Sequence, residues 1–323
     1  MVYEYVTPKV LRVYDEYRSD IGFSNSYLIL GEQVTLIDAG LTSQPRSIIE
    51  ALHNADRDLK DVKYILLTHA HPDILGGLSW LSGKTGATIC CSRWTADMLA
   101  SFEDILVKSF NLSKNYNLLL RHKGININFK SLKAGRLLEH RNLINLSGEK
   151  IIAVESGGHC KGHLCYWVPD GNILFSGDEL YCHPNNRNMI MIDRTGSFSK
   201  REHALEIFRE LQPSIICQAH DIPIMSNIDE SISEALDIQK SWRTAVLEYL
   251  TLHSDADVLE IENYVFKFFN VKWDSHISKL ENHSTILKIL EFLEEEDCIR
   301  KSGSQRVKEE KTRWSIINQN LDL

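Results

Sequence analysis

The chain of 323 residues is long for one domain and indicates two domains of unequal size. Its hydrophobic content of 43% and its formal net charge of −8 indicate a globular protein and disfavour a nucleic-acid backbone as the main partner, because phosphate binding requires clustered Lys and Arg. We expect no signal peptide and no membrane span, because no basic stretch precedes an apolar core at the N-terminus and no apolar run approaches about 20 residues. The seven cysteines have irregular spacing, which indicates reduced thiols and a cytoplasmic location.

The first half of the chain predicts a β-meander followed by alternating helices and strands. Short apolar runs predict strands at 10–14, 26–30 and 34–37. Apolar residues at helical spacing then predict a helix at 43–53 and a short one at 76–82, between strands at 62–67 and 87–91. Helical spacing continues from 96 to 110, and we expect helices that border the pocket as far as residue 130.

Two histidines and an aspartate follow the predicted strand at 62–67 at alternating positions: His69, His71 and Asp73. Side chains two residues apart in extended backbone point the same way, so these three converge on one point. Two imidazoles and a carboxylate suit a divalent metal ion. The alternative is a purely structural role, in which polar residues end the strand and Asp73 is the N-cap of a helix.

The second half of the chain predicts further strands at 137–138, 143–146, 151–154, 164–168, 172–175 and 214–217. Three of them also end near a polar residue that binds metals well. Chance explains one or two such strand ends, whereas four in one chain predict a built metal site. The members of the four groups are His69 with His71 and Asp73, then His159, Asp178 and His220.

These motifs, in this order and spacing, resemble those of the metallo-β-lactamase superfamily: His-x-His-x-Asp, Gly-His-x-x-Gly-His, Ser-Gly-Asp and a late His. Ile37-Asp38-Ala39-Gly40 is similar to the first motif of that family, and the resemblance covers about residues 10–235. It implies an α/β fold, the αββα metallo-β-lactamase sandwich, with metal at one edge. It also implies that His69, His71 and His159 hold one ion, that Asp178 bridges, and that Asp73 and His220 serve a second. Asp38 and His163 then have supporting roles.

One position departs from the family pattern, because Ile74 stands where the family has the last His of its second motif. Isoleucine binds no metal, which leaves three interpretations open. The site holds one ion between His69, His71, His159 and Asp178, or it binds a second ion weakly with water or His183 as an added ligand, or activity has been lost. The sequence Ala219-His220-Asp221 also replaces the usual Gly-His-Gly.

The ligand set predicts hydrolysis by a metal-activated water, with one or two Zn ions and with Fe or Mn as alternatives. If no second metal holds Asp73, we expect this residue to orient that water or to shuttle its proton. We expect Tyr181 either to donate to an oxyanion or simply to pack at the rim. The resemblance to the glyoxalase II-like branch implies a small ester, thioester or lactone as substrate. The alternatives are a metal-dependent ribonuclease, a mononuclear iron sulfur dioxygenase and a degenerate binding protein.

The remaining chain predicts a second domain at 238–323, after a catalytic domain at 1–237. Amphipathic helices are expected around Trp242, at 258–269 and at 284–296, followed by strands at 298–301 and 313–317. The pattern resembles the winged-helix module of some members of this superfamily. From residue 240 onward there are 12 Lys and Arg against 15 Asp and Glu, which disfavours nucleic acid. We expect a module that covers the catalytic face or forms a homodimer contact.

Overall fold

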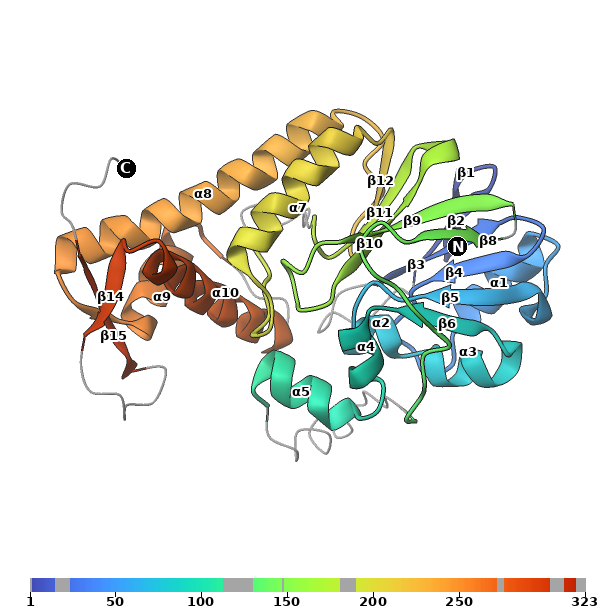
Figure 1. Ribbon diagram of the computed structural model, residues 1–323, viewed down its shortest axis with the longest axis horizontal. Helices are drawn as coiled ribbons and strands as arrows, with labels where there is room; N and C mark the ends of the chain where they lie inside the picture. Colours follow the sequence, from blue (N-terminus) through green and yellow to red (C-terminus); the bar gives the residue numbers. More distant parts are fainter. Residues whose placement is uncertain are drawn as a thin grey trace.

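The computed structural model describes residues 2–14, 24–112, 130–146, 148–180, 190–271, 276–302 and 311–317. Two β-sheets lie against each other, helices cover their outer faces, and a helical extension projects from one end of the sandwich (Figure 1). The order of the layers is α, β, β, α, as the sequence predicts.

The first sheet has seven strands whose spatial order follows their order in the chain. The first four strands pair antiparallel, and the last four, from β4 onward, pair parallel. The strands are β1 (Tyr3–Thr7), β2 (Val10–Tyr14), β3 (Asn25–Leu30), β4 (Val34–Ile37), β5 (Val62–Leu66), β6 (Thr88–Cys91) and β7 (Arg136–Leu137). The helices of this part are α1 (Arg46–Asn54), α2 (Pro72–Leu75), α3 (Leu78–Thr85), α4 (Arg93–Met98) and α5 (Phe102–Phe110), with the short 3₁₀ helix η1 (Leu59–Asp61) before β5.

The second sheet has five strands in the order β12-β11-β10-β9-β8. All its pairs are antiparallel except β11 with β12, which helix α7 (Phe198–Leu211) connects in parallel. Its strands are β8 (Leu143–Leu146), β9 (Glu149–Glu155), β10 (Leu164–Val168), β11 (Ile173–Gly177) and β12 (Ile215–Gln218), and the 3₁₀ helix η2 (Pro169–Gly171) makes the turn between β10 and β11.

The cores follow from the alternation of side chains along the strands. On β5, Ile65 packs under α1 and α3, whereas its neighbour Leu66 lies between the two sheets. On β11, Phe175 likewise lies between the sheets, and Leu174 packs against α7 and the start of α8. Each sheet therefore buries both of its faces, and its loops are left to carry polar side chains at the sheet ends.

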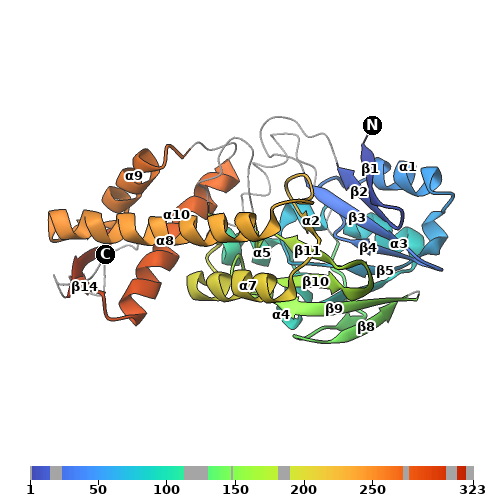
Figure 2. The same ribbon diagram turned by 90° about the horizontal axis from the view of Figure 1, so that it is seen from above.

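A long helix, α8 (Ile228–His253), runs beside α7 and out of the sandwich (Figure 2). It leads to β13 (Ala256–Asp257), α9 (Val258–Phe268), α10 (His276–Glu295), β14 (Ile299–Ser302) and β15 (Arg313–Ile316), in which the strands form a sheet of order β13-β15-β14. We call the described residues from Ser254 to Ile317 the C-terminal module. Its core continues into the sandwich, because Ile192 and Phe198 belong to the same apolar cluster as Trp242 and Ile286.

Most of the expected elements are present, with some differences. β1, α7 and β13 were not expected from the sequence. The third helix of the tail begins at His276, before the expected start at 284, and Ser284 is buried within it. The predicted boundary between residues 237 and 238 lies within α8, which is one continuous helix. The division into domains at 1–237 and 238–323 and the winged-helix assignment stay predictions. The helices expected between 113 and 129 lie outside the described residues. Within the described ranges, no helix is long and apolar enough to cross a membrane.

Candidate metal centre

Three histidines and one aspartate from separate parts of the chain meet where β5, β9 and β11 end. Donor atoms of His69, His71, His159 and Asp178 all lie within 4.8 Å of one another, and we call these residues the histidine cluster. Asp178 Oδ2 lies 3.5 Å from His69 Nε2 and 3.4 Å from His159 Nε2, and His71 Nδ1 lies 3.1 Å from His159 Nε2. Ligands that share one cation at about 2.0–2.2 Å have this spacing.

A second group shares one residue with the first. His220 Nε2 lies 3.0 Å from Asp73 Oδ2 and 3.3 Å from Asp178 Oδ2, and we call Asp73, Asp178 and His220 the carboxylate cluster. All six expected metal ligands therefore lie in two groups that overlap at Asp178. The structural alternative for Asp73 is wrong in one detail, because His71 is the N-cap of α2 and Asp73 lies in its first turn.

Two buried atoms of the histidine cluster have no hydrogen-bond partner among the described residues: His69 Nε2 and Asp178 Oδ1. A buried polar atom without a partner is costly, so native proteins rarely keep one without a bound ion or water. Both atoms carry lone pairs and belong to the donor set. The residues present therefore fit a divalent cation.

The other ring nitrogen of each histidine in the cluster has its own partner. His159 Nδ1 donates to the carbonyl oxygen of Met191 at 2.7 Å, and His71 Nε2 donates to Asp193 Oδ2 at 3.0 Å. Thr68 Oγ1 donates to Asp38, and it accepts from His69 Nδ1 at 2.9 Å. Each hydrogen bond fixes the tautomer, so the facing nitrogen presents its lone pair to the centre of the cluster.

Asp38 and His163 hold the loops that carry these ligands. Asp38 Oδ1 accepts from the backbone N–H of Thr68 at 2.8 Å, directly before His69. The backbone N–H of Asp178 donates to His163 Nε2 at 3.2 Å, and His163 Nδ1 donates to Ser156 at 2.7 Å. Burial lowers the pKa of His163 to about 3, so this ring is neutral and can accept. The supporting roles that the resemblance implies agree with these contacts.

Burial and the nearby carboxylates set the pKa values of the groups in the histidine cluster. Burial lowers the pKa of His69 and of His159. Burial opposes ionisation of Asp178, but the nearby imidazoles of His220, His159 and His69 outweigh it. They hold the pKa of that carboxyl well below its usual range. Burial also lowers the pKa of His71, but the Asp193 carboxylate outweighs it and raises this pKa to about 9, so this ring must release a proton before its Nδ1 binds a cation. A buried carboxylate that stays ionised among imidazoles attracts a positive ion.

The sequence reasoning did not find two acidic neighbours of His71. Asp193 belongs to the segment before α7, and its other oxygen accepts the backbone N–H groups of Thr195 and Gly196. Glu281 comes from α10, and its Oε1 lies 3.8 Å from His71 Nδ1. Burial raises the pKa of Glu281 to about 8. Neither residue lies in a recognisable motif, because distant elements bring both of them to the site.

Ile74 lies fully buried in the apolar cluster beneath the first sheet, together with Ala39 and Leu75. It is therefore a core residue in this chain. Tyr181 and His183, which the sequence suggested as an oxyanion donor and an added ligand, lie outside the described residues. The side chains of Asp73 and His220 are 18% and 14% exposed, whereas those of the histidine cluster are at most 4% exposed. Solvent therefore meets the site on the side of Asp73 and His220.

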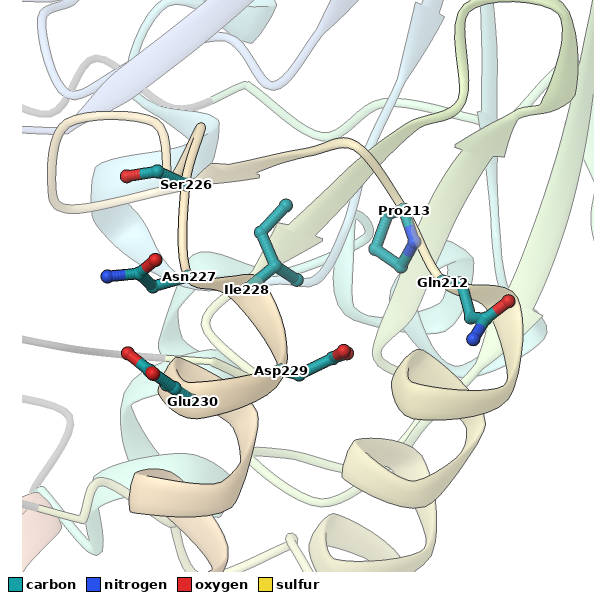
Figure 3. A pocket seen from close by; sticks show the side chains of 7 residues that line it. All are labelled: Gln212, Pro213, Ser226, Asn227, Ile228, Asp229 and Glu230. Atoms are coloured by element: carbon teal, nitrogen blue, oxygen red, sulfur yellow. The ribbon is translucent and has the colours of Figure 1, made fainter.

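A surface hollow of about 400 Å³ lies elsewhere, between the end of α7 and the start of α8 (Figure 3). Residues 212–213 and 226–230 line it. None of the metal-site residues is among them, so this hollow has no part in metal binding.

The chain is similar in sequence to known hydrolases. A sequence model of the metallo-beta-lactamase superfamily matches residues 19–220. The chain is 23% identical over 234 residues to the probable metallo-hydrolase YqjP of Bacillus subtilis (strain 168), and the match covers 67% of the chain and 72% of that protein. It is 22% identical over 138 residues to hydroxyacylglutathione hydrolase of Rhizobium meliloti (strain 1021), across 43% of the chain and 40% of that protein.

A solved structure is similar over nearly the whole chain. The metallo-beta-lactamase family protein TTHA1429 from Thermus thermophilus superposes with a TM-score of 0.72 at 18% identity, across 97% of this chain and 100% of that one. At this identity the likeness concerns the fold alone. Its extent means that the C-terminal module is part of the shared fold.

Proposed function

The chain belongs to the metallo-beta-lactamase superfamily and is a metal-dependent hydrolase of that superfamily, and on this premise we propose that it cleaves a small ester, thioester or lactone. The observation that carries the proposal is the convergence of His69, His71 and His159 with Asp178, two of whose buried donor atoms have no partner among the described residues. Superfamily hydrolases act on small molecules.

We assign the histidine cluster to a first ion, which we propose to be Zn²⁺, because three imidazoles and a carboxylate are a ligand set that zinc prefers. Asp178 would also face a second ion, together with Asp73 and His220. When bound, a divalent ion supplies a water that ionises near neutral pH and a charge that stabilises an oxyanion.

The chain's own residues supply the remaining chemistry in this proposal. Asp73 lies on the more exposed side of the site, where a substrate would arrive, and its carboxylate can orient a water or accept its proton. His220 Nε2 lies within hydrogen-bond distance of Asp73, which keeps that carboxylate directed at the site. Phe110 packs on His71, with ring centroids 4.9 Å apart, and excludes water from the far side.

The small substrate is favoured over RNA for two reasons. The chain is acidic overall, and its C-terminal residues from 240 onward keep that balance. One relative is also named as a hydrolase of hydroxyacylglutathione. A single-iron dioxygenase remains the second candidate, because Ile74 removes a ligand from the second ion.

The test is hydrolysis of a panel of acyl-thioesters, aryl esters and lactones by the purified protein loaded with Zn²⁺, Mn²⁺ or Fe²⁺. We expect turnover of at least one class, and a loss of at least about tenfold in kcat for Asp73→Asn. Glu295→Gln, an exposed change on α10, serves as the control. RNA cleavage without esterase activity, or oxygen uptake with a persulfide, would contradict the proposal.

We also propose a reducing cytoplasmic location, which is supported by the six free cysteines of the described chain, five of them buried. A homodimer through the C-terminal module is a further proposal. Light scattering on the purified protein decides it, since a monomeric mass at micromolar concentration would contradict it.

A further inference from the structure

We propose that Asn25, at the start of β3, is a positioning residue for the second cation, and that Ser24 beside it has the same role. The two residues hold the backbone that carries Asp73 and His220 of the carboxylate cluster. The inference rests on the metal site proposed above and goes beyond it, because no metal-binding motif marks either residue. It gives the second site a support in a chain where Ile74 takes the place of the family's last histidine.

The backbone on both sides of His220 is bonded to Asn25. Asn25 Nδ2 donates to the carbonyl oxygen of Gln218 at 2.9 Å and to that of Asp221 at 2.6 Å. The backbone N–H of Asn25 donates to the carbonyl oxygen of Ala219 at 2.7 Å. Asn25 therefore bonds the residue that follows His220 and the two that precede it. The orientation of the His220 side chain depends on these hydrogen bonds.

The orientation of the Asn25 amide is fixed by its other partner. Arg12 Nε donates to Asn25 Oδ1 at 2.9 Å, and a guanidinium group can only donate. The oxygen of the amide therefore faces Arg12, and its NH₂ group faces the loop of His220. Arg12 is itself held by Glu4, at 2.7 Å between Nη1 and Oε1. Both Arg12 and Asn25 are buried, so water does not compete for these hydrogen bonds.

Ser24 makes the corresponding contact with the other ligand on the open side of the site. Its Oγ donates to the carbonyl oxygen of Asp73 at 3.0 Å. The carboxylate of Asp73 in turn lies 3.0 Å from His220 Nε2. Two consecutive residues thus hold the two ligands that the carboxylate cluster does not share with the histidine cluster.

Tyr27, two residues after Asn25 on β3, adds a further hydrogen bond to the same loop. Its Oη donates to the carbonyl oxygen of Gln218 at 2.6 Å. The loop of His220 is therefore held by β3 whether or not an ion is bound. Ligands that are already in place lose less conformational freedom when they bind an ion, which raises the affinity for that ion.

The contacts of Asn25 and Ser24 serve the second ion rather than the first. They end at Asp73 and at the loop of His220. The histidine cluster is supported by other residues: Thr68, Met191 and Asp193. Loss of the Asn25 donors should therefore weaken binding of the second ion and leave that of the first ion unchanged.

The experiment measures the affinity for each ion. Metal-free full-length protein is titrated with Mn²⁺ in a calorimeter, and the bound Mn²⁺ is counted by mass spectrometry and followed by electron paramagnetic resonance. We expect the unchanged protein to bind a first and a second ion, with the coupled spectrum of ions that share Asp178. Asn25→Asp should bind the second ion about 10- to 100-fold more weakly and give the spectrum of an isolated ion.

The choice of Asn25→Asp isolates the effect of the donors. The carboxylate keeps the shape of the side chain and the contact with Arg12, but it presents an acceptor to the carbonyl groups of the loop. Its added negative charge would by itself strengthen cation binding. A weaker second site must therefore come from the lost hydrogen bonds.

A smaller change tests the same inference. Ser24→Ala removes one hydroxyl group and should weaken the second ion less than Asn25→Asp does, again without effect on the first. Asn172→Asp and Ser214→Ala are matched controls, because each removes a side-chain donor to a backbone carbonyl at the end of β11 away from the site. Both controls should match the unchanged protein.

Three results would overturn the inference: a single ion at saturation in the unchanged protein, an unchanged second affinity in Asn25→Asp, or equal weakening of both ions in a variant that still melts at the original temperature. If Asn25→Asp does not fold, Ser24→Ala decides by the same criteria. Because the titration needs no substrate, failure of the hydrolase proposal leaves this test unaffected.

Discussion

At the scale of single residues, the site is organised by the nitrogen of each histidine that faces away from the centre. Each of these nitrogens forms a hydrogen bond, to Met191, Asp193 or Thr68, so the opposite nitrogen of the ring is left to bind a metal ion. His163 differs, because both of its nitrogens bond within the protein. The geometry thus separates ligands from supporting histidines.

This difference predicts the outcome of histidine replacement. His69→Ala and His159→Ala should each abolish binding of the first ion, because each removes one of four donors. His163→Ala should bind metal with reduced affinity, since it removes only a support of Asp178. Metal content after dialysis measures the effect, with His253→Ala, an exposed residue at the end of α8, as control. Full metal content in His159→Ala would show that the ligand assignment is wrong.

Replacement of Asp193 should weaken metal binding although it removes none of the proposed ligands. Asp193→Asn should lower affinity for the first ion by about 10- to 100-fold, because it removes the charge that orients His71 and raises its basicity. Titration with a metal indicator measures the affinity. The same change at the exposed Asp237 of α8 should have no effect. An unchanged affinity in Asp193→Asn would mean that His71 is held by other contacts.

At the scale of elements, the loop after β9 depends on a residue without a side chain. A Cβ at Gly158 would lie 1.9 Å from Glu179 Oε1 and 2.4 Å from the Cα of Arg201. The backbone of α7 cannot give way at that distance, so the loop must shift. This loop is therefore packed tightly against Glu179 and the backbone of α7.

Gly158→Ala should therefore lower the free energy of unfolding by about 1–3 kcal/mol or more, and it should weaken metal binding because His159 follows directly. Gly83→Ala is the matched control: no atom lies within 4 Å of the added Cβ, and the position is within α3. That change should raise the free energy of unfolding by about 0.5–1 kcal/mol. Denaturant titration of both variants tests the pair, and a stabilising Gly158→Ala would contradict the packing described.

The sheet of the C-terminal module is tied by Asp255, which accepts from Ser302 of β14 and Arg313 of β15. These hydrogen bonds lower the pKa of Asp255. Because the folded pKa is depressed, this stabilisation is present above the unfolded pKa of about 3.9 and is lost as pH falls through the folded value. The pair is partly exposed, which limits the contribution to about 0.5–1 kcal/mol.

Asp255→Asn should therefore reduce the free energy of unfolding by that amount at pH 7, and the difference should shrink as the pH falls below about 4. Chemical unfolding at a series of pH values measures it. A difference that stays constant down to pH 3 would mean that the ionised carboxylate is not the cause.

The secondary-structure elements and the candidate metal site differ in how much of each could be predicted from the sequence. Strands 10–14, 34–37 and 164–168 were expected with the bounds that the structure gives, because turn residues mark their ends. The six candidate ligands that the structure brings together could be picked out because they come soon after the ends of strands. Asp193, Glu281 and helix α7 were not found, since α7 has only a weak apolar stripe and the two acids reach the site through tertiary packing.

At the scale of the whole molecule, the sandwich and the C-terminal module share an apolar core. Trp242 of α8 is fully buried in it and stacks on Phe269, with ring centroids 5.6 Å apart. The same cluster contains Ile192 and Phe198, which adjoin the metal site. The module is therefore part of the structure that holds the site.

Trp242→Ala should lower the free energy of unfolding by about 3–5 kcal/mol, because it leaves a large cavity in this shared core. Phe268→Ala, at a ring that is 61% exposed, should cost far less. Circular dichroism during denaturant titration measures both variants. Equal effects would show that the shared core does not stabilise the molecule.

The central claim is that side chains from separate parts of the chain bind one metal ion. Anomalous diffraction from a crystal of the protein, recorded across the absorption edges of Zn, Fe and Mn, tests it most directly. The account predicts a strong peak about 2.0–2.1 Å from His69 Nε2, His71 Nδ1 and His159 Nε2. A metal-loaded crystal with no peak among these three nitrogens would contradict it.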